Sequence, residues 1–390
     1  MMQKLANIKW KHYVNYILVA VALVVFMCLS FGGGLRNSHL EMIEKASISI
    51  ILAVSLSLVV GFLGELSLGH AGFMCVGAYL GCKAAVMLQE AIGNDLPDAV
   101  ALLAALLVGG AVAALCGFVI GLPALRLKGD YLAIVTLAFG EIVRSLFLNS
   151  SDESFGGTLG LDTSSLRYDR KELFIFGLLL VLVTLFVIQN LMRSRHGRAI
   201  TAIRDSEIAA HATGINVTKY KLLVFVVAAF FAGIAGVLYG FSNYTVESSV
   251  FDYNYSIEIL VMVVLGGMGS VTGAVVAATL ITVLNSWLPT VLTGDLAVLQ
   301  NLLYALVLIL VVIYGNAPAL KNFRETHNLR VLTEKFSKRK KDPAHIKDDD
   351  ASWARIPTKI PMDEILSVDV TPGESRSLLR PDKPDGKGDE

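Results

Sequence analysis

Long apolar segments alternate with short polar segments along most of this chain. A helix of about 20 apolar residues crosses the hydrocarbon core of a bilayer, which is about 30 Å thick. The pattern therefore predicts membrane-crossing helices over residues 13–31, 40–62, 66–88, 99–121, 129–149, 172–192, 222–242, 256–288 and 297–315.

The segment 256–288 is too long for one crossing, and Gly266, Gly267 and Gly269 interrupt it. Such interruptions are typical of discontinuous helices that line solute sites, although close helix packing through small residues gives the same pattern. We predict a broken helix here, which brings the bundle to about eight to ten transmembrane helices. The first segment, 13–31, lacks a clear signal-peptide cleavage site, so we expect it to be retained.

Composition agrees with a membrane protein, because 54% of the residues are hydrophobic and only 17% are charged. The mean hydropathy is +0.63. Richness in Gly, Leu, Val and Ala favours helices over a β-barrel, so the predicted fold class is an all-α polytopic integral membrane protein. The cysteines lie in apolar segments without metal-ligand spacing, and we predict small buried side chains and no metal site. They are Cys28, Cys75, Cys82 and Cys116.

The chain changes character after residue 316. Residues 317–390 contain 29 of the 66 charged side chains, including the basic run 338–341 and the acidic run 348–350. This composition predicts a largely disordered, charged tail behind a permease domain at 1–316. The basic run either contacts anionic lipid headgroups or is a solvated charge run.

Basic residues gather in alternate loops, which predicts the orientation, since cytoplasmic loops carry an excess of Lys and Arg. The N-terminal segment, the turn at 126–128 and the polar segment 195–221 are basic and fall on one side. We therefore place the N-terminus, segment 195–221 and the tail in the cytoplasm. The loop 150–171 departs from the pattern, because it contains basic and acidic residues together.

Catalytic signatures are missing from the sequence. It contains no G-x-x-x-x-G-K-[S/T] motif, no H-E-x-x-H motif and no clustered nucleophile and base. We predict no catalytic residues and no cofactor bound by the chain itself.

Two apolar segments contain residues suited to a translocation path. Gly69, His70, Gly72 and Gly77 lie in the segment 64–82, where dense small residues either line a path or allow close helix packing. In the segment 126–145, Glu141 and Arg144 are one helical turn apart and are predicted to pair. The alternative to this structural pairing is that Glu141 couples transport to proton movement. The full set of path candidates is Gly69, His70, Gly72, Gly77, Thr136, Glu141, Gly156, Gly157, Gly266, Gly267 and Gly269.

The polar segment 195–221 has apolar residues at spacings that predict one or two short amphipathic helices. Asp205 or Ser206 is expected to cap the second helix and Gly214 to end it. Such a hairpin either docks a partner or lies at the membrane interface. The residues expected on its apolar side are Ile200, Ile203, Ile208, Ala212 and Ile215.

Several motifs resemble the permease subunits of ATP-binding-cassette importers for branched-chain amino acids, and specifically the second permease of such systems. The motifs are G-E-L-S-L-G-H-A-G-F (64–73), R-L-K-G-D-Y-L-A-I-V-T-L-A-F-G-E-I-V-R (126–144), the whole segment 195–222 and L-G-G-M-G-S-V-T-G-A (265–274). They agree in order and separation over about residues 45–315. Where relatives often have T-G-G-x-N-G-I, this chain has F-G-G-T-L-G-L at 155–161, without the Asn.

The resemblance implies a set of partners and roles. The chain would be a transport subunit, without its own ATPase, in a bacterial inner (plasma) membrane. It would assemble with a homologous second permease, two cytoplasmic ATPase subunits that bind ATP, an extracytoplasmic substrate-binding protein and membrane lipid, and with no nucleic acid. The segment 207–214 resembles the coupling helix that docks on the ATPase. The implied coupling residues are Arg204, Asp205, Glu207, Ala209, Ala210 and Gly214.

Other functions remain as alternatives. Related permeases carry urea, short amides or other amino acids, and the departure at 155–161 keeps these open. A secondary transporter would use Glu65, Glu141 or Glu258 as its ion-coupling group. An integral-membrane enzyme is a third alternative, which the missing catalytic cluster disfavours.

Overall fold

The computed structural model describes residues 37–92, 98–127, 129–164, 166, 170–291 and 309. Within these residues, seven helices are long and apolar enough to cross a membrane, and the fold is an all-α polytopic membrane protein as predicted. The predicted helix 13–31, almost all of 297–315, the domain boundary at 316 and the tail 317–390 lie outside the described residues. The total number of crossings therefore stays a prediction.

The elements follow one another with short connections. The list in chain order is α3 (Asn37–Ser57), the π-helix η2 (Leu58–Leu63), α4 (His70–Ile92), α5 (Asp98–Ala124), α6 (Asp130–Leu148), α7 (Asp152–Phe155), η3 (Gly157–Leu159), β1 (Leu161–Asp162), α8 (Arg170–Arg193), α9 (Arg195–Asp205), α10 (Glu207–Ala212), α11 (Val217–Ser242), β2 (Thr245–Val246), η4 (Ser248–Val250), α12 (Tyr253–Gly266) and α13 (Val271–Val291).

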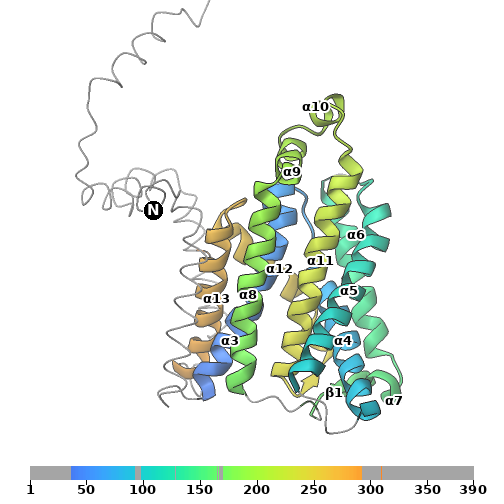
Figure 1. Cartoon of the computed structure of the whole chain (residues 1–390), viewed down its shortest axis with the longest axis vertical. Helices are drawn as coiled ribbons and strands as arrows, with labels where there is room; N and C mark the ends of the chain where they lie inside the picture. Colours follow the sequence, from blue (N-terminus) through green and yellow to red (C-terminus); the bar gives the residue numbers. More distant parts are fainter. Residues whose placement is uncertain are drawn as a thin grey trace, which may run out of the picture. The chain divides into compact units, whose positions relative to one another are not determined.

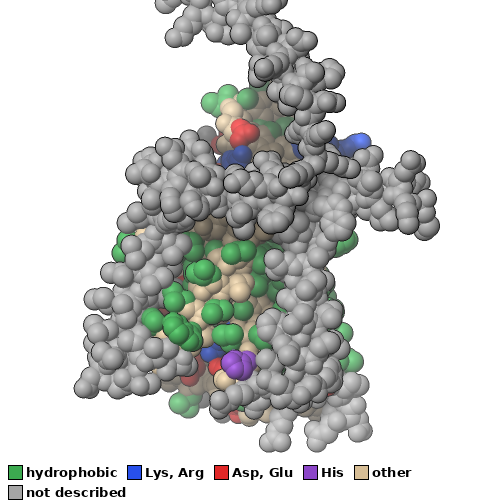
Figure 2. All heavy atoms as spheres, turned by 90° about the vertical axis from the view of Figure 1, so that its left-hand side faces the viewer, with side chains coloured by type: hydrophobic (Ala, Val, Ile, Leu, Met, Phe, Trp, Pro, Cys, Tyr) green, Lys and Arg blue, Asp and Glu red, His purple; other side chains and the backbone are tan. Residues whose placement is uncertain are grey.

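Helix α11 is the central element of the bundle. It packs against α4 and α5 on one side and α3 on another, while α3 also packs against α8 and α13; Figure 1 shows α8 and α13 beside α3. Gly77 of α4 faces the backbone of Gly233 of α11, and this pair of glycines lets the two helices approach closely. Long side chains of α5, α6, α8 and α13 point outward, as expected for helices that face lipid. In Figure 2, hydrophobic side chains cover the middle of the visible described surface.

The two ends of the bundle carry different structures. At one end lie α9 and α10. The start of α11 lies at the same end, where Leu222 packs against Leu125 and Leu132 next to the turn between α5 and α6. We call this the α10 end. At the other end, β1 pairs antiparallel with β2, which follows the last turn of α11. We call this the β end.

Three predicted segments need correction or refinement. The predicted helix 66–88 begins only at His70, so Gly69 precedes the helix instead of lying within it. Residues 64–69 are non-helical, because Gly64 takes a left-handed conformation (φ 81°) and ends the π-helix before them. The predicted helix 222–242 begins earlier, at Val217, because the Asn216 side chain caps it there. The break in 256–288 is confirmed, and the two helices are α12 and α13.

The close approach of α4 and α11 gives a stability prediction. We expect Gly77→Ala to lower the free energy of unfolding by about 1–3 kcal/mol, because the new methyl group would overlap the Gly233 backbone. Gly140→Ala is the matched control, since a methyl group there would be 3.8 Å from its nearest neighbour. Thermal unfolding of the detergent-purified protein measures both. Equal melting temperatures for the two variants would contradict the packing role.

Candidate functional site

The hairpin of α9 and α10 is built by side-chain caps. The Ser194 hydroxyl accepts hydrogen bonds from the backbone N–H groups of His196 and Gly197 and starts α9. The chain then becomes extended at Ser206 (φ −161°, ψ 108°), whose hydroxyl accepts from Ala209 N at 3.3 Å and starts α10. Gly214, with φ +84°, follows the end of α10. Of the one or two short helices predicted, the structure shows two, and of the two predicted caps, Ser206 is the one that forms.

The apolar side of the hairpin differs partly from the prediction. Ile200 and Ile203 of α9 are buried as expected. Ile208 is 83% exposed, so its predicted place on the apolar side was wrong, and Ala212 is exposed too. The extended residue Ser206 turns α10 relative to α9, so one helical periodicity does not continue through both, and Ala210 becomes the buried residue of α10.

The cap at Ser206 gives a second prediction. We expect Ser206→Ala to destabilise α10 by about 1 kcal/mol, because the N–H of Ala209 would lose its acceptor. Hydrogen exchange at residues 207–213 should then be faster by roughly fivefold. Ser206→Asp keeps a capping oxygen and should exchange like the wild type. Unchanged exchange in Ser206→Ala would show that the cap does not hold α10.

A buried ammonium group connects α10 to the interior of the bundle. Lys221 of α11 is 3% exposed, and its Nζ donates to Glu65 Oε1 at 2.6 Å. The same Nζ is 3.4 Å from Glu207 Oε2 at the start of α10. Glu65 lies in the non-helical segment that leads into α4. Lys221 therefore links the start of α10 to the non-helical segment that leads into α4.

Arg204 makes a second connection at the α10 end. Its Nη1 donates to Gly61 O of the π-helix at 3.3 Å, and its side chain lies against Gly64. It also contacts Asp205 Oδ1, with Nη2 at 3.2 Å. Gly269, in the break between α12 and α13, lies beside both Gly61 and the Arg204 guanidinium. Arg204 thus joins the hairpin to the last turn of the first described membrane helix.

The predicted coupling residues fall into two groups. Arg204 and Glu207 point inward and contact the bundle, with Asp205 bound to Arg204 and Ala210 buried. Ala209 and Gly214 are exposed on the hairpin. Sequence reasoning missed Lys221 and Gly61 as partners. The signal for Lys221 was a lysine next to a long apolar run, but nothing in the spacing paired it with Glu65.

The path candidates in the segment 64–82 lie mainly in helix contacts. A side chain at Gly69 would meet the Thr136 backbone, and one at Gly72 would meet Gly140. Thr136 also accepts a hydrogen bond from Leu68 N at 3.0 Å, and buried His70 shares one with Ser55 Oγ at 2.8 Å. These contacts fix the non-helical segment inside the bundle, and they favour the packing alternative for the glycines.

Glu141 pairs as predicted. Arg144 Nε donates to Glu141 Oε2 at 2.9 Å. Glu141 Oε1 also accepts from the backbone N–H of Tyr253, the first residue of α12, at 3.2 Å. The pair therefore connects α6 to the start of α12 and is a structural contact between helices.

The remaining path candidates lie at turns. Gly156 and Gly157 have positive φ values and precede β1 at the β end. Nearby, Asp162 accepts a hydrogen bond from the backbone N–H of Ser164 at 2.8 Å, which lowers the pKa of the Asp162 carboxyl group. Gly267 and Gly269, also with positive φ, form the break between α12 and α13, and Gly266 packs against Gly273.

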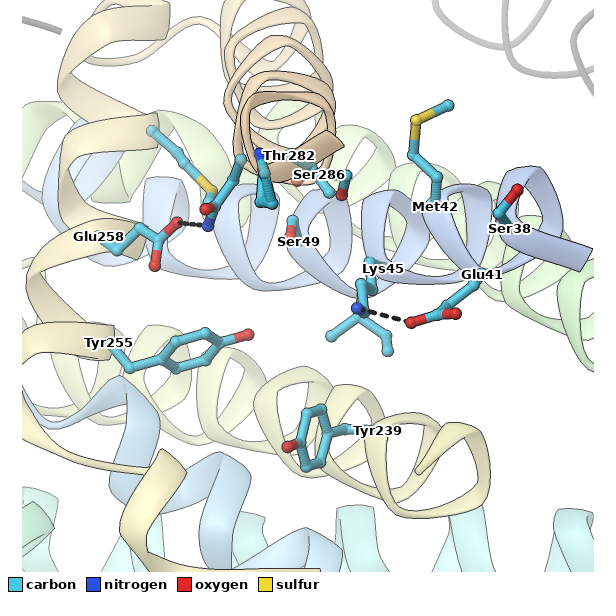
Figure 3. A pocket seen from close by; sticks show the side chains of 14 residues that line it. Ser38, Glu41, Met42, Lys45, Ser49, Tyr239, Tyr255, Glu258, Thr282 and Ser286 are labelled. Carbon is cyan, nitrogen blue, oxygen red and sulfur yellow. Dashed lines mark hydrogen bonds and ion pairs between the residues drawn. The ribbon is translucent and has the colours of Figure 1, made fainter. Parts of the chain in front are cut away.

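A cavity of about 430 Å³ lies between α3, α11, α12 and α13. Figure 3 shows side chains from these helices around it, with Tyr239 and Tyr255 across from α3. None of the predicted path candidates is among the residues that line it. Glu258, named above only for an ion-coupled alternative, does line it.

Comparison with known proteins identifies the family. The model of the family described as "Branched-chain amino acid transport system / permease component" matches residues 38–312. The chain belongs to this family. It is 36% identical over 308 residues to the high-affinity branched-chain amino acid transport system permease protein LivM of Salmonella typhimurium, covering 71% of this chain and 68% of that protein. It is also 26% identical over 289 residues to the ribose import permease protein RbsC of Escherichia coli, covering 72% and 86%. No solved structure matches the chain.

Family membership makes the chain a multi-pass membrane permease, and the seven described helices agree with that. The predicted resemblance is thereby confirmed, and so is the predicted function as a permease of the branched-chain amino acid importer type. The chain is a transport subunit.

Proposed function

We propose that this permease imports branched-chain amino acids into a bacterial cytoplasm as one of two homologous permease subunits. Two ATPase subunits bind ATP and drive the permease from the α10 end. A substrate-binding protein delivers the amino acid at the β end. The α10 end, together with the N-terminus and the tail, is cytoplasmic in this proposal. The excess of basic residues at 126–128 and 195–221 supports that orientation.

The observation that carries the proposal is the form of α10. It presents Ile208, which is 83% exposed, outward from the bundle, while Glu207 on the same helix contacts buried Lys221. An exposed aliphatic side chain at the tip of a helix suits insertion into an apolar groove on a partner. The inward contacts of Glu207 and Arg204 would pass the partner's movement to the membrane helices.

Ion-coupled transport is less well supported. Glu65 and Glu141 form ion pairs with Lys221 and Arg144 at 2.6 Å and 2.9 Å, so fixed cations already occupy both carboxylates. Glu258 accepts a hydrogen bond from Asn285 at 3.2 Å. At Glu65 and Glu141, a transported cation would have to displace the ammonium and guanidinium partners.

Co-purification and uptake test the proposal together. We expect the tagged chain to purify with its ATPases, and the reconstituted complex to take up leucine, and not urea or ribose, only with ATP and binding protein. Ile208→Asp should reduce ATPase recovery about tenfold or more, because it places a charge in the apolar contact.

Leu159→Asp is the matched control, since Leu159 is 77% exposed at the β end. It should keep full ATPase recovery. Full ATPase recovery with Ile208→Asp would contradict docking through α10. Leucine uptake by this chain without any ATPase would contradict the proposed function.

A further inference from the structure

The cavity between α3, α11, α12 and α13 lies in the half of the bundle toward the β end. The part of α3 that lines it runs from Ser38 to Ser49, far from the Gly61 turn that contacts Arg204. On α11 it is lined by Tyr239, one turn before the helix ends near β2. Its volume of about 430 Å³ falls within the usual range of small-molecule sites, roughly 300–1,000 Å³.

Charges of both signs line this cavity, on the membrane-spanning helix α3 and on the shorter apolar helix α12. Lys45 of α3 binds Glu41 at 2.8 Å, one turn earlier, and both side chains are over 40% exposed. Glu258 of α12 accepts a hydrogen bond from Asn285 of α13 at 3.2 Å. Charged groups at membrane depth are costly unless they pair or face a polar cavity, and they commonly mark substrate pathways.

The charges are separated along the cavity. In Figure 3, Glu258 lies at one end and the Lys45–Glu41 pair lies toward the other. The Lys45 ammonium has three donor hydrogens, and its bond to Glu41 uses one of them. The Glu258 carboxylate has about four acceptor positions. Both groups therefore have more hydrogen-bonding positions than the contacts described above use.

Apolar and hydroxyl side chains complete the lining. Met42, Ile48 and Met262 are apolar residues of the lining, and Ile48 and Met262 expose only small parts of their surface, 4% and 3%. Thr282 and Ser49 add hydroxyl groups, although the Thr282 hydroxyl already donates to Ala278 O. Opposite charges at separate positions with an apolar wall between them match a small aliphatic zwitterion better than a neutral sugar or urea.

We propose that this cavity binds the amino acid during transport, with Lys45 contacting its carboxylate, Glu258 its ammonium group, and Met42, Ile48 and Met262 its aliphatic side chain. The inference rests on the proposed function and adds a substrate-contacting site to it. It places recognition of the zwitterion within this chain, in addition to the recognition made by a binding protein. The predicted path glycines lie outside this site.

The test uses the whole complex, reconstituted in vesicles with its sister permease, ATPases and leucine-loaded binding protein. We expect Glu258→Gln and Lys45→Met each to slow leucine uptake about tenfold or more, because each removes a charge-assisted hydrogen bond to the solute. Basal ATP hydrolysis should stay within about twofold of the wild type. Glu258→Asp keeps the carboxylate and should keep most uptake. Glu90→Gln, at an exposed glutamate outside the cavity, is the matched control.

The possible outcomes separate the two proposals. Wild-type uptake rates in both Glu258→Gln and Lys45→Met would overturn the cavity assignment and leave the proposed function intact. A parallel loss of uptake and basal ATP hydrolysis would also overturn it, because the charges would then support folding or coupling. A wild-type complex that imports no leucine in any condition would overturn the proposed function itself.

Discussion

Replacing Lys221 with methionine is expected to lower the free energy of unfolding by about 3–5 kcal/mol, because it removes one partner of a buried ion pair. The side chain of Lys221 is 4% exposed and that of Glu65 13%, so water would compensate the orphaned carboxylate poorly. Glu207 would lose its ion pair with Lys221 as well. Thermal unfolding of the purified protein should show a fall of several degrees, and leucine uptake by the complex should be lost.

Two further variants make this test specific. Lys219→Met changes an exposed lysine two residues earlier on the same helix and should leave the melting temperature unchanged. Lys221→Met combined with Glu65→Gln removes both buried charges, and it should regain part of the lost stability through a coupling of about 1–3 kcal/mol. If the double variant were no more stable than Lys221→Met alone, the Glu65–Lys221 pair would not be the source of the effect.

Most of the helical architecture could be predicted because hydrophobic length determines it. Each described membrane helix matches a predicted apolar segment, and the glycines at 266–269 correctly predicted the break between α12 and α13. The errors lie where polar backbone enters the bundle. Hydropathy continued through residues 66–69, but the chain is non-helical there after the left-handed Gly64, and Thr136 accepts a hydrogen bond from its backbone. Such compensation comes from another helix and leaves no local signal.

The hairpin at 195–214 could be predicted in outline for a different reason. Its caps and its helix-ending glycine are local features, and the Ser206 cap followed from residue type alone. The exposure of Ile208 could not be predicted in this way. It depends on the direction of α10 relative to α9, which the single extended residue Ser206 sets.

The contacts of the candidate site could not be predicted, because their partners are far apart in the sequence. Glu65 and Lys221 are 156 positions apart, and Arg204 and Gly61 are 143 apart. No periodicity in one sequence connects residues at such separations. The cavity is similar, because its lining comes from four helices and its charges look like ordinary helix-end charges in the sequence. The path prediction relied on glycine density, and most of the glycines that it selected in the segment 64–82 lie in close helix contacts instead of the cavity lining.

The second large effect is expected from Arg204→Met, which should separate ATP hydrolysis from transport. Arg204 joins the α9–α10 hairpin to Gly61 O at 3.3 Å and lies beside Gly269 of the α12–α13 break. A hydrogen bond to a charged group contributes about 1.5–3 kcal/mol, so its loss should slow ATP-driven uptake by about 10- to 100-fold. ATPase recovery should be unaffected, because Ile208 and the exposed face of α10 are unchanged.

A matched variant decides whether the loss of uptake comes from the Arg204–Gly61 contact or from the loss of a positive charge at the α10 end. Arg198→Met removes an exposed arginine of α9, two turns before Arg204, and should keep normal uptake. Arg204→Lys keeps the positive charge but loses the planar guanidinium that reaches both Gly61 and Asp205, so we expect intermediate uptake. Equal loss in Arg198→Met and Arg204→Met would mean that total positive charge at the α10 end, and not the connection to Gly61, supports transport. Full uptake by Arg204→Met would mean that movement is transmitted through other contacts of the hairpin, such as the Glu207–Lys221 ion pair.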